Sequence, residues 1–142
     1  MLRRYTTSDF EQLIQLFLLN TPAYFHEQEQ QDLEEYLHTE IEDYFVIEQE
    51  GPIVACGECN VEDNTGWLSW YIVHPAYHGK GLGRLLANHS IDVLKANVRV
   101  KAIVVRTSQF VYPFYEKLGF KLTRTQDDYW APGYHLFHME LL

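Results

Sequence analysis

The chain has 142 residues, of which 46% are hydrophobic and 15% aromatic, and it carries a formal net charge of −9 at pH 7. This length and apolar content predict one folded domain over residues 1–142 rather than a disordered chain. The acidity argues against a nucleic-acid partner, which needs a concentrated basic surface. It favours a cationic partner, unless it serves only to keep the protein soluble.

The first half of the sequence predicts two helices and four strands. A short strand over Leu2–Tyr5 is followed by a capping box at Ser8–Glu11, and apolar residues at helical spacing extend that helix to about Leu19. A second amphipathic helix covers about Gln28–Glu40. Three strands joined by short turns come next, at Tyr44–Glu48, Ile53–Val61 and Trp67–Val73.

The second half continues the alternation of helices and strands. The predicted elements are a helix from Gly81 to about Ala96, a strand over 100–107, a helix over 110–118, a strand over 120–126 and a last strand over Tyr134–Leu141. No apolar run approaches the roughly 20 residues that span a bilayer, and no signal peptide opens the sequence. We therefore expect a cytoplasmic, reduced protein without a membrane partner.

The cysteines and histidines do not form a metal-binding pattern. Cys56 and Cys59 lie three apart in a predicted strand, so their side chains should face opposite sides of the sheet as small buried hydrophobes. The same spacing separates His135 from His138, and the other histidines are scattered. We expect no metal site. The oligomeric state is open, with a homodimer as one alternative.

The most informative segment is the strand-to-helix turn between Trp70 and Leu86. An apolar run leads through a proline turn to three glycines at alternating positions, Gly79, Gly81 and Gly83. Glycines let the backbone approach an anion closely, and the free amides of a first helical turn point at it. A tight turn alone explains one glycine but poorly explains three. The segment therefore predicts a phosphate-binding turn.

Two common phosphate motifs do not fit this turn. A P-loop would need glycine at the position of His74 and a hydroxyl residue at that of Gly81, and a dinucleotide fingerprint would need glycine at that of Arg84. The run His78-Gly-Lys-Gly-Leu-Gly83 instead resembles the (Gln/Arg)-x-x-Gly-x-(Gly/Ala) pattern of the GNAT superfamily, with histidine at the first position.

A second resemblance lies downstream. The run Phe114-Tyr-Glu-Lys-Leu-Gly-Phe120 is similar to a GNAT segment that is far more specific than the glycines, and it follows the 100–107 strand. On both motifs the chain is identified as a member of this superfamily of acyl-CoA-dependent N-acetyltransferases. The resemblance implies an α/β fold of the α+β type. The implied GNAT fold has a mixed, mainly antiparallel sheet of about seven strands, helices on both faces, and strands that splay apart around the coenzyme.

The resemblance also implies a reaction, in which acetyl-CoA donates its acetyl group to a primary amine of a small molecule or peptide in a ternary complex. It places Tyr115 as the general acid at the departing sulfur, where packing of the ring is the alternative, and the Val73 amide at the thioester oxygen. It assigns coenzyme contacts to Tyr71, Ile72, Val73, His78, Gly79, Lys80, Gly81, Leu82, Gly83, Arg84, Ser108 and Tyr115. Ser108 stands where many members carry asparagine.

The general base and the acceptor are less defined. Glu58 is the one carboxylate within the 53–61 strand and is our hypothesis for the base, against a water relay or a solvent-facing role for Glu58. Aromatic residues could line the acceptor site or pack in the core, and they are Tyr24, Phe25, Tyr36, Trp70, Tyr129 and Trp130. The alternative function is an acyl-CoA-binding sensor or partner-binding module without turnover.

Overall fold

The computed structural model of the protein describes residues 1–39, 41 and 43–141. The elements are β1 (Leu2–Arg4), α1 (Phe10–Leu19), α2 (Glu29–Thr39), β2 (Asp43–Glu48), β3 (Ile53–Glu62), β4 (Thr65–Val73), α3 (Leu82–Ala96), β5 (Ala102–Thr107), α4 (Tyr112–Lys117), β6 (Phe120–Ala131) and β7 (Tyr134–Leu141). Single turns of 3-10 helix lie at Thr7–Asp9 and Pro75–Tyr77. The predicted end of α2 at Glu40 lies outside the described residues.

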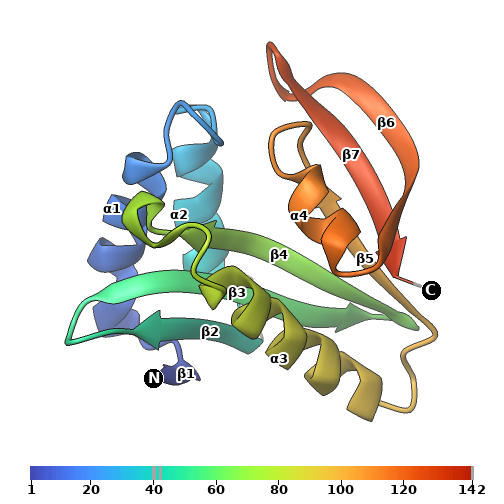
Figure 1. Cartoon of the computed structure of the whole chain (residues 1–142), viewed down its shortest axis with the longest axis horizontal. Coiled ribbons are helices and arrows are strands. Elements are labelled where there is room, and N and C mark those ends of the chain that lie inside the picture. Colours follow the sequence, from blue (N-terminus) through green and yellow to red (C-terminus); the bar gives the residue numbers. More distant parts are fainter. Residues whose placement is uncertain (40, 42, 142) are drawn as a thin grey trace.

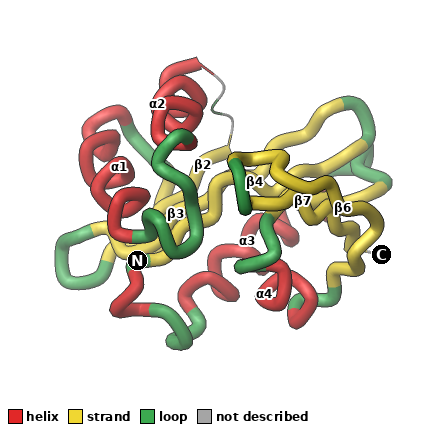
Figure 2. The backbone as a smooth tube through the Cα atoms, turned by 90° about the horizontal axis from the view of Figure 1, so that it is seen from above, coloured by secondary structure: helices red, strands yellow, loops and turns green. Residues whose placement is uncertain are grey.

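The seven strands form one sheet in the order β1-β2-β3-β4-β5-β7-β6. Every neighbouring pair is antiparallel except β4 and β5, which are parallel. Figure 2 shows α1 and α2 together on one face of the sheet and α3 and α4 on the other. The mixed, mainly antiparallel sheet with helices on both faces is therefore confirmed.

Each face of the sheet has its own hydrophobic core. Leu13 and Phe17 of α1 pack with Leu33 of α2 on one face, and Leu86 and Leu94 of α3 belong to the core on the other. The cysteines follow the predicted alternation: Cys56 belongs to the first cluster and Cys59 to the second, and both are buried free thiols. The spacing of three therefore separates them across the sheet.

The sheet divides where β4 meets β5. The two strands pair from Thr65 and Ala102 to Leu68 and Val105, and no pairing is described beyond those residues. The remainder of β4 and the end of β5 diverge, so the two halves of the sheet spread apart in Figure 1. This is the splay that the resemblance implied. Backbone groups at a strand end without a neighbour can bind a ligand.

Two local predictions were wrong. The capping interaction lies two residues earlier than Ser8–Glu11, because the Asp9 carboxylate accepts a hydrogen bond from the Thr6 amide at 2.9 Å and α1 begins after it. Strand β6 runs to Ala131 rather than to residue 126. Its residues between Phe120 and Trp130 are exposed, so no apolar alternation marks that part of the strand.

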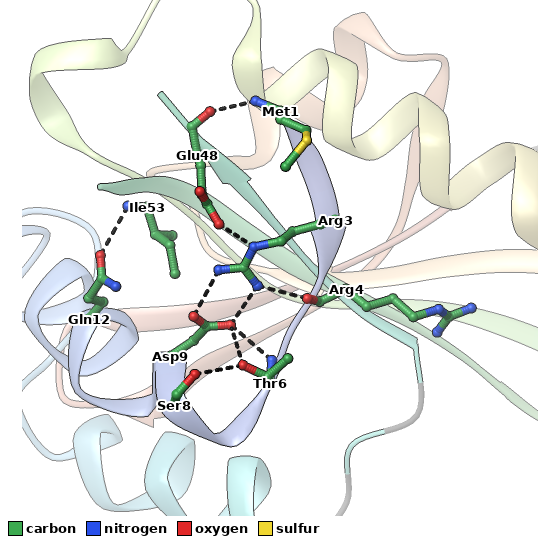
Figure 3. A network of polar contacts seen from close by, with 9 residues as sticks. All are labelled: Met1, Arg3, Arg4, Thr6, Ser8, Asp9, Gln12, Glu48 and Ile53. Carbon is green, nitrogen blue, oxygen red and sulfur yellow. Dashed lines mark hydrogen bonds and ion pairs between the residues drawn. The ribbon is translucent and has the colours of Figure 1, made fainter. Parts of the chain in front are cut away.

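An ionic network joins the N-terminal strand to the first helix (Figure 3). The Arg3 guanidinium donates to both Asp9 carboxylate oxygens at 2.8 and 2.9 Å and also to Glu48 of β2. Asp9 is buried, and its hydrogen bonds with Arg3 lower the pKa of its carboxyl. The pair therefore clamps β1, β2 and the start of α1 together.

Replacing Asp9 by asparagine should lower the free energy of unfolding by about 1–3 kcal/mol at pH 7, because a charged partner is removed from Arg3. When folding lowers the pKa of a carboxyl, that carboxyl stabilises the folded state at pH values above its unfolded pKa. The stabilisation is lost as the pH falls through the folded-state pKa. The difference from wild type should therefore shrink toward pH 3. Urea unfolding over this pH range measures it, with exposed Glu11→Gln as control. A difference independent of pH would contradict the ionic explanation.

Candidate active site

The glycine turn has the backbone geometry of an anion site. Gly79 and Gly81 have φ of +77° and +82°, in the left-handed region that favours glycine. Gly83 lies within α3, where a Cβ would stand 3.2 Å from the Phe114 ring, so glycine lets α4 approach. Helix α3 begins at Leu82 with Gly81 as its N-cap, and its first amides face outward along the helix dipole.

A cavity of about 400 Å³ adjoins this turn. Most of the residues expected to contact the coenzyme line it, namely Tyr71, Ile72, Val73, His78, Gly79, Gly81, Leu82, Gly83, Arg84 and Tyr115. Lys80 and Ser108 are not among its described lining residues. The Lys80 ammonium lies over the Tyr77 ring at 5.4 Å, and the Ser108 hydroxyl accepts from the Phe110 amide at 3.3 Å.

A second cavity of about 730 Å³ lies beside the first. The two share five lining residues, Tyr24, Phe25, Tyr71, Val111 and Tyr115. They therefore meet where β4 and β5 separate. The far end of the larger cavity reaches the β3–β4 turn and is acidic, since Glu62 and Asp63 line it there. This arrangement can bring two different molecules together at one point.

Tyr115 lies at that meeting point. It is 3% exposed and makes edge contacts with Tyr71, Phe114 and Phe120. Burial raises the pKa of the Tyr115 phenol above its usual value, so the hydroxyl stays protonated at neutral pH. The ring thus packs α4 against the sheet, and the hydroxyl keeps a proton that it can donate.

Val73 directs its backbone toward the gap. The His74 amide donates to the Val54 carbonyl at 2.8 Å, which makes Val73 and Ala55 a non-hydrogen-bonded pair of the antiparallel ladder. The Val73 amide and carbonyl consequently point away from β3. Asn20 Nδ2 donates to this carbonyl at 3.1 Å, and His78 Nε2 lies 2.8 Å from it. His78 therefore supports the end of β4 through its ring.

A bulge in β4 shapes the site. The register changes between Cys56 and Glu58, and Trp70 has a φ of +54°. The Tyr71 side chain crosses Gly57, where a Cβ would stand 2.8 Å from its ring, and its hydroxyl bonds Ser90 of α3. The bulge turns the Tyr71 side chain toward α3.

Glu58 is fully buried, so its interpretation as a solvent-facing residue was wrong. It stands opposite Tyr44 and Ser69 in the sheet. Ser69 lines the larger cavity, whereas Glu58 is not among the described residues that line either one. Its role as base stays a prediction.

Glu29, at the start of α2, is a buried acid that the sequence interpretation missed. It is 6% exposed, lines the larger cavity and accepts a hydrogen bond from the His26 amide at 2.9 Å. Burial, with a smaller contribution from Asp32, raises the pKa of Glu29 to about 7. Its spacing from Leu33 and Tyr36, on the apolar face of a helix, was the available signal.

Aromatic rings wall the larger cavity. Trp70 stacks with Phe25 at 6.2 Å and contacts Tyr36 at 6.1 Å between ring centres. The Tyr134 hydroxyl donates to the Pro22 carbonyl at 2.6 Å and so joins the β6–β7 hairpin to the α1–α2 loop. Of the aromatic residues expected at the acceptor site, five line this cavity, namely Tyr24, Phe25, Tyr36, Trp70 and Trp130, and exposed Tyr129 does not.

Within residues 1–39, 41 and 43–141, no group of three or more His, Cys, Asp or Glu side chains is placed to hold a metal ion. No helix in this part of the chain has the length and apolar character required to cross a membrane.

Comparison with known proteins identifies the family. A model of the acetyltransferase (GNAT) family matches residues 10–120. The chain belongs to this family. The GNAT fold is also found in the ribosomal-protein-S18-alanine N-acetyltransferase from Escherichia coli, with a TM-score of 0.80, 21% identity and coverage of 99% of this chain and 92% of that one.

One further solved structure has a similar fold, and one curated protein has a similar sequence. An aminoglycoside 6'-N-acetyltransferase solved with coenzyme A has a TM-score of 0.76 at 15% identity, covering 99% of this chain and 95% of that one. A curated amino-acid acetyltransferase from Mannheimia succiniciproducens is 29% identical over 133 residues, 89% of this chain. The matched region is only 28% of that relative, so the chain resembles one part of a longer protein.

Gly57→Ala should lower the free energy of unfolding by about 1–3 kcal/mol, because the added methyl group meets the Tyr71 ring. Thermal or urea unfolding measures the loss. In a Tyr71→Leu background the same substitution should cost much less, since the ring is gone. An equal cost in both backgrounds would show that contact with Tyr71 is not the cause.

Glu29→Gln should raise the melting temperature at pH 8. Folding raises the pKa of Glu29 above its usual value, so ionisation disfavours the folded state increasingly as pH rises from about 4.5 to about 7. The gain should be largest at pH 8 and vanish near pH 4, where the carboxyl is protonated in both states. Glu27→Gln, an exposed neighbour, is the control. A melting temperature lower than that of wild type at pH 8 would refute the desolvation argument.

Proposed function

We propose that the protein transfers the acetyl group of acetyl-CoA to a primary amine of a small molecule or peptide by direct attack in a ternary complex. The observation that carries this proposal is the meeting of two cavities at buried Tyr115. One cavity adjoins a phosphate-binding turn, and the other has acidic and aromatic walls. Membership of the GNAT family supports the same reaction.

The smaller cavity is the proposed coenzyme site. The pyrophosphate would bind the amides at the start of α3, beside Arg84 and with Lys80 adding positive charge from outside. The pantetheine arm would lie in the gap beside Tyr71, Ile72 and Val73, in the manner of an added strand. Ser108 would contact the coenzyme at the junction, because it lines the neighbouring cavity at the end of β5. The coenzyme A complex of a structural relative supports this assignment.

The reacting groups follow from the needs of acetyl transfer. An alkylammonium with a pKa of about 10.4 costs about 5 kcal/mol to deprotonate at pH 7, so a proton acceptor is required. The thioester oxygen gains negative charge in the transition state, and the Val73 amide points toward the gap where it would donate to that oxygen. The departing thiolate needs a proton, which the protonated Tyr115 phenol would supply.

Acceptor candidates come from the relatives. The curated relatives are named amino-acid acetyltransferases, so amino acids should head the set of amines tested, followed by aminoglycosides and peptides with free N-termini. A binding module without turnover is the competing function, favoured by the departures at His78 and Ser108. Both an acetyltransferase and a binding module would bind the coenzyme, so binding does not distinguish the two functions. Release of free coenzyme A from acetyl-CoA in the presence of these amines would distinguish them.

Tyr115→Phe should lower kcat by about 10²–10⁴-fold while leaving coenzyme A affinity within about threefold, because only the donated proton is removed. Thiol release measured with a chromogenic reagent gives kcat, and calorimetry gives the affinity. Tyr112→Phe on the same helix is the matched control and should retain activity. Unchanged kcat in Tyr115→Phe would remove Tyr115 from the chemistry.

A further inference from the structure

We propose that Glu29 binds the ammonium group of the acceptor in the larger cavity and then accepts its proton. This rests on the proposed acetyl transfer and names the acceptor class as a cationic primary amine with an apolar body. Glu29 of α2, rather than Glu58 of β3, is then the general base of the reaction.

Glu29 faces the right space. It lines the same cavity as Tyr115, although α2 lies on the opposite face of the sheet from α4 (Figure 2). Its Oε2 atom accepts from the His26 amide at 2.9 Å, which holds the carboxylate in place at the beginning of the helix. Glu58, by contrast, is buried and is not among the described lining residues. An acceptor in the cavity would therefore meet Glu29 directly.

The residues that line the larger cavity with Glu29 suit an ammonium group that becomes a neutral amine. Aromatic rings attract an ammonium group and also pack against an apolar body, and Trp70, Phe25 and Tyr36 supply such rings. The Tyr36 hydroxyl is buried and lacks a hydrogen-bond partner among the described residues, so an acceptor could satisfy it. A carboxylate among apolar rings binds an ammonium strongly, because water competes less for either group.

Charged and titratable groups near Glu29 come from several elements. Asp32 of α2 adds negative charge, and His26 precedes the helix. The other ionisable groups lining the cavity are Tyr24, Tyr36, Glu62, Asp63, Tyr71, Arg106, Tyr115 and Tyr134. Burial sets the pKa of Glu29 near 7, so its carboxylate both forms and accepts a proton close to neutral pH.

The protons balance over the reaction. The bound ammonium passes one proton to the Glu29 carboxylate, and the neutral nitrogen attacks the thioester carbon. The carbon–nitrogen bond forms and the carbon–sulfur bond breaks, while Tyr115 protonates the departing sulfur. The second proton leaving nitrogen replaces the one that Tyr115 gave up. Glu29 releases its proton to solvent, so one proton is produced for each acetamide formed.

The test compares pH profiles of kcat/KM between pH 5.5 and 9, with the amine from the acceptor set that releases coenzyme A fastest. In wild type, kcat/KM should fall tenfold per pH unit below about pH 7. Glu29→Gln should lower kcat/KM by about 10²–10⁴-fold at pH 7.5. It should also remove the break near pH 7, so that kcat/KM rises with pH throughout the range as the free-amine fraction grows. Glutamine can still accept from the His26 amide, so the helix start is preserved.

Two matched variants identify the titrating group. Glu58→Gln and His26→Gln should each keep the break near pH 7, because one removes the competing carboxylate and the other a nearby imidazole. Loss of the break near pH 7 in Glu58→Gln, or its persistence in Glu29→Gln, would overturn the assignment to Glu29.

A binding measurement tests the same residue without turnover. Calorimetry with coenzyme A present should show benzylamine binding at least tenfold more tightly at pH 8 than at pH 5.5 in wild type, and Glu29→Gln should lose this difference. Equal binding by both proteins would refute the role of Glu29 even if wild type acetylates amines. Binding that depends on Glu29, without coenzyme A release from any amine, would instead leave the cation site standing and refute the proposed function.

Discussion

The site depends on the point at which β4 and β5 stop pairing. Parallel strands that continued to pair would bond their amides and carbonyls to each other and leave no room between them. Because pairing with β5 ends at Leu68 and Val105, the remainder of β4 has no strand partner on that side and borders a gap instead. The two cavities meet at this gap. One adjoins the phosphate-binding turn, and the other has acidic and aromatic walls.

The two helical layers have different tasks around this gap. Helix α3 starts at the glycine turn and aims its first amides outward, while α4 brings Tyr115 to the junction. On the other face, α2 brings Glu29 to the larger cavity, and the Arg3–Asp9 pair ties the start of α1 to the sheet. Stability is concentrated in the two cores. The buried Glu29 carboxylate, whose ionisation disfavours folding, lies instead at the larger cavity.

Much of the fold could be predicted because its signals are local. The β-branched run before Thr107 and the glycines after His78 each define one element, and the family resemblance of the two motifs implied the splayed sheet. The exposed end of β6 could not be predicted, since a strand without a buried face has no alternation. Glu29 was missed for a related reason. An acid at a helix start usually faces water, and the burial of Glu29 arises from tertiary packing that the local sequence does not show.

The acidic end of the larger cavity affects how an acetylation cycle would finish. Glu62 and Asp63 line the cavity where it approaches the β3–β4 turn, so the electrostatic potential there attracts positively charged molecules. An amide carries no charge at neutral pH. The negative potential would attract a cationic acceptor into the cavity but would not hold its neutral amide product. The product could therefore leave without a conformational step that weakens an electrostatic attraction.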